Sequence, residues 1–119
     1  MPALEITLQV KPVSAKPVIY QFSRSGFGPD NDINFTIQDS AGQVYDLTGK
    51  TASLILLDRI TKHGIFEKDL DIVSPTGGTA KYEPKEGDFS FLNIYYLLVR
   101  IKDSANEEYT ERPVLFQVV

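Results

Sequence analysis

Hydrophobic and polar residues alternate with a period of two along much of this chain. The alternation is clearest in three segments, where every second side chain is apolar: residues 4–10, 33–37 and 95–101. Successive side chains of a β-strand point to opposite faces of a sheet, so this pattern predicts strands with one buried face. No segment keeps a helical spacing over the length of a helix. The chain is therefore expected to be all-β.

Clusters of Gly, Pro, Asp, Asn and Ser separate the predicted strands and mark tight turns. The clearest turns are at residues 39–42, 46–49, 74–78 and 103–106. Regularly spaced strands with turn signals between them predict an immunoglobulin-like antiparallel β-sandwich of seven or eight strands. We expect five side chains to be buried together between its sheets: Phe35, Leu54, Tyr95, Val99 and Phe116.

One predicted strand, residues 52–57, is apolar almost throughout. This composition is expected of a strand that is covered on both faces or that faces a partner. A second strand, 95–101, has two distinct faces. Its inward face carries Tyr95 and Val99, whereas Tyr96, Leu98 and Arg100 point the other way. Aromatic residues and Arg are enriched in protein interfaces, so these three residues are a candidate interface; an ordinary outer sheet face is the alternative.

The amino-terminal residues 1–17 contain a clean strand pattern, followed by a connection that holds Pro12 and Pro17. After this connection, residues 18–22 are expected to continue along a sheet edge. We expect an edge strand or an assembly arm in residues 1–17. An edge strand exposes unpaired backbone groups that a neighbouring chain can satisfy, although a first strand normally pairs within its own domain. Both interpretations stay open. The candidate interface residues of this segment are Leu4, Ile6, Leu8 and Val10.

The composition fits one globular domain, residues 1–119, with 42% hydrophobic residues. The net charge is −4, from 16 acidic and 12 basic residues spread along the chain, so nucleic-acid binding is not expected. The longest apolar stretches fall far short of the roughly 20 residues of a spanning helix, so we expect no membrane contact. The start has no secretory signal and is expected to be an intact cytosolic beginning. With no cysteine, disulfides and thiolate metal sites are excluded.

Several short motifs, in this order, resemble the amino-terminal immunoglobulin-like domain of phage baseplate upper proteins. They are Phe-x-Ile at 35–37, Asp-x-x-Gly at 39–42, Asp-Leu-Thr-Gly at 46–49, Gly-Gly-Thr-Ala-Lys-Tyr at 77–82 and the terminal hairpin 95–119. The resemblance covers roughly residues 30–119. Two features depart from the family: Asn93-Ile94 precedes Tyr95 where members usually carry glycine, and the long helical stem after the domain is absent.

The resemblance implies a scaffold for protein–protein docking, with no active site to transfer. It also implies other virion structural proteins as partners, many copies in a symmetric assembly, and a place in the virion after assembly in the host cytoplasm. Tail, baseplate and capsid all remain open.

The chain offers little catalytic or cofactor chemistry. His63 is the only histidine, and a zinc site or a serine triad would need it together with partners that the sequence lacks. Gly77-Gly78 precedes no helical pattern and is expected to be a hairpin turn rather than a phosphate loop. We therefore expect no catalytic residue and no cofactor.

Two acidic groups are the remaining candidates for a site. Residues 30–32, Asp-Asn-Asp, carry oxygens that calcium could use, but the glycine and distal glutamate of an EF-hand loop are missing, so turn formation is expected. Asp69 and Asp71 are expected to be the solvated face of a strand whose other face holds Leu70 and Ile72. The sequence thus predicts a non-catalytic virion structural protein; the alternative is a bacterial surface or carbohydrate-binding β-sandwich module.

Overall fold

The computed structural model describes residues 4–10, 18–22, 32–85, 87–89, 93–110 and 114–119. Within these ranges no helix is long and apolar enough to cross a membrane. The chain forms ten strands there: β1 (Leu4–Gln9), β2 (Val18–Phe22), β3 (Ile33–Gln38), β4 (Thr51–Asp58), β5 (Gly64–Asp69), β6 (Asp71–Ser74), β7 (Thr79–Tyr82), β8 (Asn93–Lys102), β9 (Glu107–Tyr109) and β10 (Val114–Val118).

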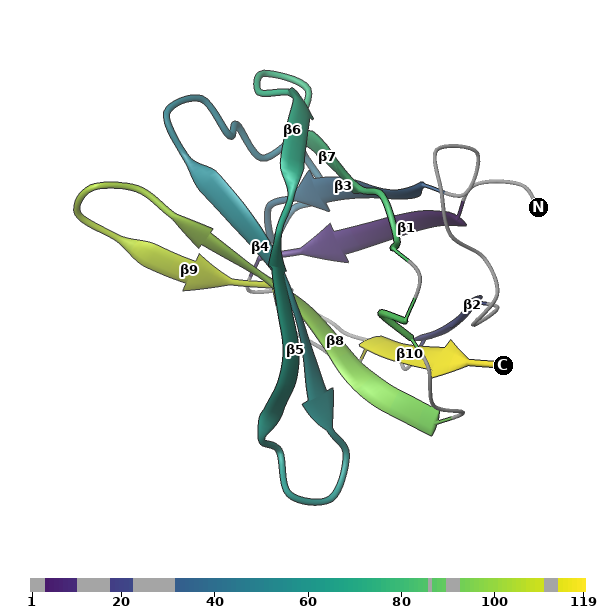
Figure 1. The fold of residues 1–119 in the computed structure, drawn as a ribbon. Coiled ribbons are helices and arrows are strands. Elements are labelled where there is room, and N and C mark those ends of the chain that lie inside the picture. The colour runs from purple at the N-terminus through teal and green to yellow at the C-terminus, as the bar shows by residue number, and fades with distance from the viewer. Residues whose placement is uncertain (1–3, 11–17, 23–31, 86, 90–92, 111–113) are drawn as a thin grey trace.

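The strands form two sheets in a sandwich-like arrangement (Figure 1). One sheet has the order β1-β3-β7-β6; the other has the order β2-β10-β8-β4-β5, with β9 also paired to β8. The predicted all-β sandwich is confirmed, and β2 lies at a sheet edge as expected. The number of strands is higher than the seven or eight predicted, for two local reasons.

The first reason is that the predicted strand that holds Leu70 and Ile72 divides at Leu70. The N–H of Leu70 donates to the carbonyl of Ala52 at 2.8 Å, and β5 and β6 on either side of it belong to different sheets. The second reason is β9, whose sequence Glu-Glu-Tyr has no apolar alternation. It pairs with β8 across the turn 103–106. It has no inward apolar side chain from which a strand could be predicted.

The sheets are mixed rather than purely antiparallel. β1 pairs in parallel with β3, with Leu4 opposite Ile33, and β2 pairs in parallel with β10, with Val18 opposite Val114. Parallel neighbours require a crossover connection instead of a tight turn. Turn signals therefore carry no information about the direction of these two pairs.

The core lies between the sheets, and the five predicted core residues are all buried there. One end of the core is aromatic: the Phe89 ring contacts those of Phe22, Phe66 and Phe116, and Phe22 also contacts Phe116, with ring centroids 5.1–5.9 Å apart. Such edge-on and offset ring pairs stabilise a core slightly beyond the burial of their area.

The predicted turns are confirmed by their hydrogen bonds. The Asp39 carboxylate accepts the N–H groups of Ala41 and Gln43, both at 2.9 Å, and Gly42 takes the left-handed conformation at φ 81°. Asp46 accepts the N–H of Thr48 in the same way. Aspartate suits these turns because its side chain replaces the missing backbone acceptors.

Candidate docking surfaces

The outer face of the larger sheet carries three of the candidate interface residues. In β8 the side chains of Tyr95 and Val99 are buried in the core, whereas Tyr96, Leu98 and Arg100 are half-buried on the opposite face. The predicted alternation of this strand is therefore confirmed. Because β8 lies between β10 and β4, this face is at the middle of the sheet.

The strand register extends the apolar part of this face across three strands. Tyr96 lies between Leu115 of β10 and Leu57 of β4, and Leu98 lies opposite Ile55 of β4. Ile55 is only 8% exposed, yet it stands outside the core cluster. We call these five residues the outer apolar band. The apolar run 52–57 is thus explained, because its alternate residues face the core and the band.

Polar groups around the band are paired with one another. Arg100 Nη2 donates to Glu67 Oε2, and the ammonium of Lys62 lies 5.2 Å from the centre of the Tyr96 ring. At the opposite edge, the amide of Gln21 donates to that of Gln117 at 2.9 Å. An apolar centre with a polar, solvent-exposed rim is the usual anatomy of a protein interface.

The candidate residues of the amino-terminal strand lie elsewhere. Ile6 and Leu8 are 1% exposed and Val10 is 4% exposed, all within the core cluster, and Leu4 packs against that cluster. β1 pairs with β3 of its own domain and is the end strand of its sheet. These apolar side chains are occupied within the domain, so a contact of β1 with another chain has to use its backbone edge or the exposed Glu5 and Thr7 of its outer face. Such a contact stays a prediction.

The candidate residues for metals and catalysis do not converge in the described part of the chain. His63 is exposed in the loop between β4 and β5, and Asp39 and Asp46 serve their own turns. Asp32 pairs with Lys81 at 3.7 Å, while Asp30 and Asn31 lie outside the described residues. Among the residues that the structure describes, no group of three or more His, Cys, Asp or Glu side chains is placed to hold a metal ion.

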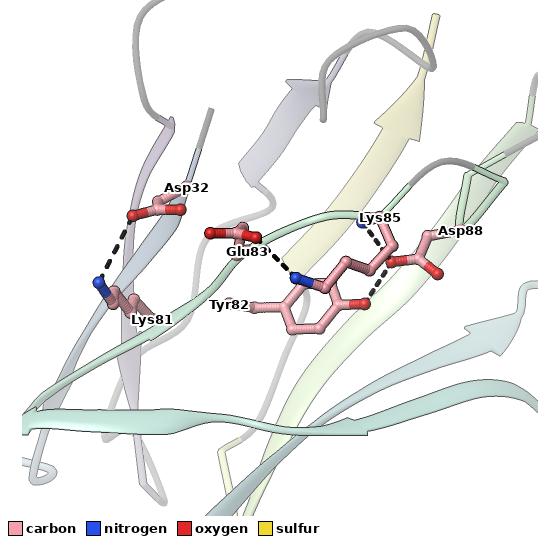
Figure 2. A network of polar contacts seen from close by, with 6 residues as sticks. All are labelled: Asp32, Lys81, Tyr82, Glu83, Lys85 and Asp88. Carbon is pink, nitrogen blue, oxygen red and sulfur yellow. Dashed lines mark hydrogen bonds and ion pairs between the residues drawn. The ribbon is translucent and has the colours of Figure 1, made fainter. Parts of the chain in front are cut away.

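A polar network that the sequence did not reveal closes the segment after β7 (Figure 2). The hydroxyl of Tyr82 donates to the carboxylate of Asp88, and the N–H of Lys85 donates to the same oxygen at 2.8 Å. Burial and this acidic partner raise the pKa of Tyr82. The network folds the chain back on itself directly before Phe89, which enters the aromatic core.

Comparisons with known proteins agree with the fold. Neither a protein-family model nor a curated protein matches the sequence. A solved structure, the N-terminal domain of phage TP901-1 ORF48, matches with a TM-score of 0.73 over 99% of this chain and 98% of that chain. The two sequences are 17% identical, so the likeness shows a shared fold and leaves function to be argued from the surface.

Proposed function

We propose that this chain is a non-catalytic structural domain of a phage virion, which docks onto other virion proteins through the outer apolar band. The observation that carries the proposal is the band itself. The fold shared with a phage protein domain and the motifs that resemble baseplate upper proteins support the phage assignment. The proposal covers a position in the tail, the baseplate or the capsid.

The position of the band favours a docking role. The outer face of an antiparallel sheet is normally polar where it meets water. Here the central rows of that face are Leu115–Tyr96–Leu57 and Leu98–Ile55. Burying an exposed Leu side chain in full contributes about 1.5–3 kcal/mol, and the half-buried residues of the band can gain only part of that each, so several of them together are needed for a specific contact.

A symmetric assembly strengthens contacts of this size. Association loses translational and rotational freedom, which offsets much of the apolar gain for a single small domain. When many copies are held in one ring or shell, each further contact forms at a high effective concentration. A weakly binding free domain can therefore be firmly held in a particle. β1, with its backbone edge at the end of a sheet, is proposed as a second contact of the same kind.

Leu98→Glu tests the proposal, because it places a charge in the centre of the band without touching the core. We expect a folded variant that is lost from purified phage particles, measured by quantitative mass spectrometry of the particles. Val73→Glu is the matched control: Val73 is exposed on β6, in the other sheet, and this variant should be incorporated normally. Incorporation of Leu98→Glu at the wild-type level would overturn the proposal.

A further inference from the structure

The loop between β4 and β5, with its flanking strand ends at residues 58–64, projects from the sandwich (Figure 1). We call it the hairpin tip. It presents Ile60, which is 90% exposed and is the most exposed large apolar side chain among the described residues. Arg59 and Lys62 outnumber Asp58 in this segment, so the tip has a net charge of +1 in a chain whose net charge is −4.

The hairpin tip is held in shape by several hydrogen bonds. Asp58 Oδ1 accepts the N–H of Ile60 at 2.8 Å and that of Thr61 at 2.9 Å. The N–H of Lys62 donates to the carbonyl of Asp58 at 2.9 Å, and the N–H of Asp58 donates to the carbonyl of His63 at 3.0 Å. The exposed position of Ile60 is therefore fixed by the loop, which lowers the entropy lost when it docks.

A pocket lies at the opposite end of the same strand pair. It is a shallow, open hollow of about 480 Å³, and its accessible apolar surface comes mainly from the half-buried Ile72, because Ala52 and Leu70 belong to the core. Asp69 and Asp71 line it as well, and both are exposed. We call it the β4–β6 pocket. It places two carboxylates beside the partly exposed Ile72, and its acidic rim is opposite in charge to the hairpin tip.

One cation, Lys50, also lines this pocket. Its ammonium donates to the hydroxyl of Tyr45 at 3.2 Å and lies 4.7 Å from the centre of the Tyr45 ring. Tyr45 in turn donates to Glu108 at 2.8 Å. The bond to Tyr45 holds Lys50 on that side of the pocket and leaves its charge in place. Asp69, which accepts the Ser53 hydroxyl at 3.1 Å, and Asp71 outnumber this one cation, so the lining has a net negative charge.

We propose that the hairpin tip of one copy docks into the β4–β6 pocket of a second copy, with Ile60 in the pocket and the two cations beside Asp69 and Asp71. The inference rests on the proposed function, because it names a second copy of this chain as one partner. Ile60 lies just beyond Asp58, the last residue of β4, whereas Thr51, the first residue of β4, lines the pocket. The eight residues of this strand span about 26 Å at the usual rise, so the tip of one molecule is too far from its own pocket to fill it.

Ile60 and the pocket lie at opposite ends of one molecule, which makes the contact head-to-tail. A heterologous contact of this kind repeats from copy to copy and closes into a ring when the rotation permits. The contact is small, so it is weak for two free molecules and gains strength when other contacts hold the copies in an array. The outer apolar band remains free for a different virion protein.

Disulfide trapping tests the contact, because the natural chain contains no cysteine. Ile60→Cys in one copy is mixed at high concentration with Thr51→Cys in a second copy that carries a mass tag. Thr51 lines the pocket and is exposed, so both variants should fold normally. We expect the mixed disulfide to form several-fold faster than in a control pair of Ile60→Cys with Ile19→Cys. Ile19 is exposed at the opposite edge of the same sheet.

Two results would overturn the contact. One is a mixed disulfide that forms no faster than in the control pair. The other is a dominant disulfide between two copies of the Ile60→Cys variant, which would indicate a head-to-head contact.

Charge reversal supplies an independent readout of the same contact. Lys62→Glu, added to the Ile60→Cys copy, should slow the trapping about two- to fivefold, the range for one exposed ion pair. Asp71→Lys, added to the Thr51→Cys copy, should by itself also slow formation of the mixed disulfide. When Lys62→Glu is present in the other copy, the two reversed charges attract again and the rate of disulfide formation should recover. Additive slowing in the combined variants would contradict the proposed pairing of charges.

The trapping experiment uses the purified chain alone, whereas incorporation of Leu98→Glu is measured in particles. Slow trapping overturns only the contact between copies and leaves docking through the outer apolar band intact. Normal incorporation of Leu98→Glu together with fast trapping overturns the proposed use of the band and leaves the head-to-tail contact.

Discussion

Thr110 and Val99 hold each other through two hydrogen bonds. The N–H of Val99 donates to the Thr110 hydroxyl at 2.9 Å, and the N–H of Thr110 donates to the carbonyl of Val99 at 3.0 Å. Thr110 also forms an antiparallel bridge with Val10, directly after β1. A single buried threonine thus ties the end of β1, from one sheet, to the middle of β8 in the other.

Thr110→Val should destabilise the domain although the two side chains have the same shape. The substitution leaves the buried N–H of Val99 without its acceptor, which costs about 1–3 kcal/mol. Thr110→Ser keeps the hydroxyl and serves as the control, with a smaller loss from the missing methyl group. Urea denaturation of both variants checks the order. A Val variant more stable than the Ser variant would contradict the role of the hydroxyl.

Phe35→Ala should lower the free energy of unfolding by about 3–5 kcal/mol, because it removes a large aromatic side chain from the centre of the core. Phe35 lies in β3, between β1 and β7, and is fully buried. Ile60→Ala is the matched control and should change stability little, since Ile60 makes its proposed contact only with another copy. Equal melting temperatures for Phe35→Ala and the wild type would refute the strand register.

Gly78→Ala should be more destabilising than Gly49→Ala. Both glycines have left-handed backbones, at φ 66° and 74°. A Cβ at Gly78 would lie 2.7 Å from the carbonyl oxygen of Tyr45 and 2.8 Å from that of Ile37, whereas a Cβ at Gly49 meets nothing within 4 Å. The Gly49 variant should therefore show only the backbone cost, about 1–2 kcal/mol. Thermal melts that place the two variants in the opposite order would contradict the close approach.

Acid should weaken the turns that rest on aspartate. The N–H groups of Ala105 and Asn106 donate to Asp103 and hold the pKa of this carboxyl below its usual 3.8. A carboxyl whose pKa is lower in the folded state stabilises the fold above its unfolded pKa, and this contribution is lost as the pH falls through the folded pKa. Asp103→Asn keeps an acceptor oxygen but cannot titrate. Its stability, compared with that of the wild type by denaturation at about pH 7 and about pH 2, should fall less steeply toward acid.

Much of the fold follows from period-two patterns, and the reason is physical. In β3 and β8 one face meets the core, so the register of apolar residues determines which face is buried. The same pattern identifies Tyr96, Leu98 and Arg100 as the opposite face. The direction in which neighbouring strands pair could not be predicted in this way. β1 and β2 reach their parallel partners through long connections, and no local sequence signal specifies whether such a pair is parallel or antiparallel.

Surfaces formed by residues far apart in the sequence could not be predicted, for a related reason. The β4–β6 pocket joins Ala52 to Asp69 and Asp71 because β4 pairs with β5 and the chain then crosses to the other sheet at Leu70. The two aspartates are exposed, as predicted, and alternate with Leu70 and Ile72. Their proximity to the pocket depends on the crossing of the chain from one sheet to the other at Leu70, which no local sequence pattern predicts.

Deletion of residues 1–12 distinguishes the two uses of the amino-terminal strand. Its side chains Ile6, Leu8 and Val10 are buried in the core of the same domain. Removing them should cost well over about 2 kcal/mol, since the loss of each is comparable to a large-to-small core substitution. We therefore expect a large drop in melting temperature, measured by circular dichroism on the purified domain before any assembly assay. An unchanged melting temperature would contradict the place of β1 in the core.

A contact through the backbone edge of β1 calls for a gentler change. The N–H of Thr7 donates to the Tyr20 hydroxyl at 3.3 Å, whereas the N–H groups of Leu4 and Val10 donate to Asp32 and Gln38 on the side of β3. Thr7→Pro thus removes the bond to Tyr20, together with the donor that an added strand would use in its place, and leaves the ladder to β3 intact. If a neighbouring chain adds a strand there, this variant should fold with a modest loss of stability yet fail to enter particles. A variant that folds and is incorporated normally would limit β1 to its place within the domain.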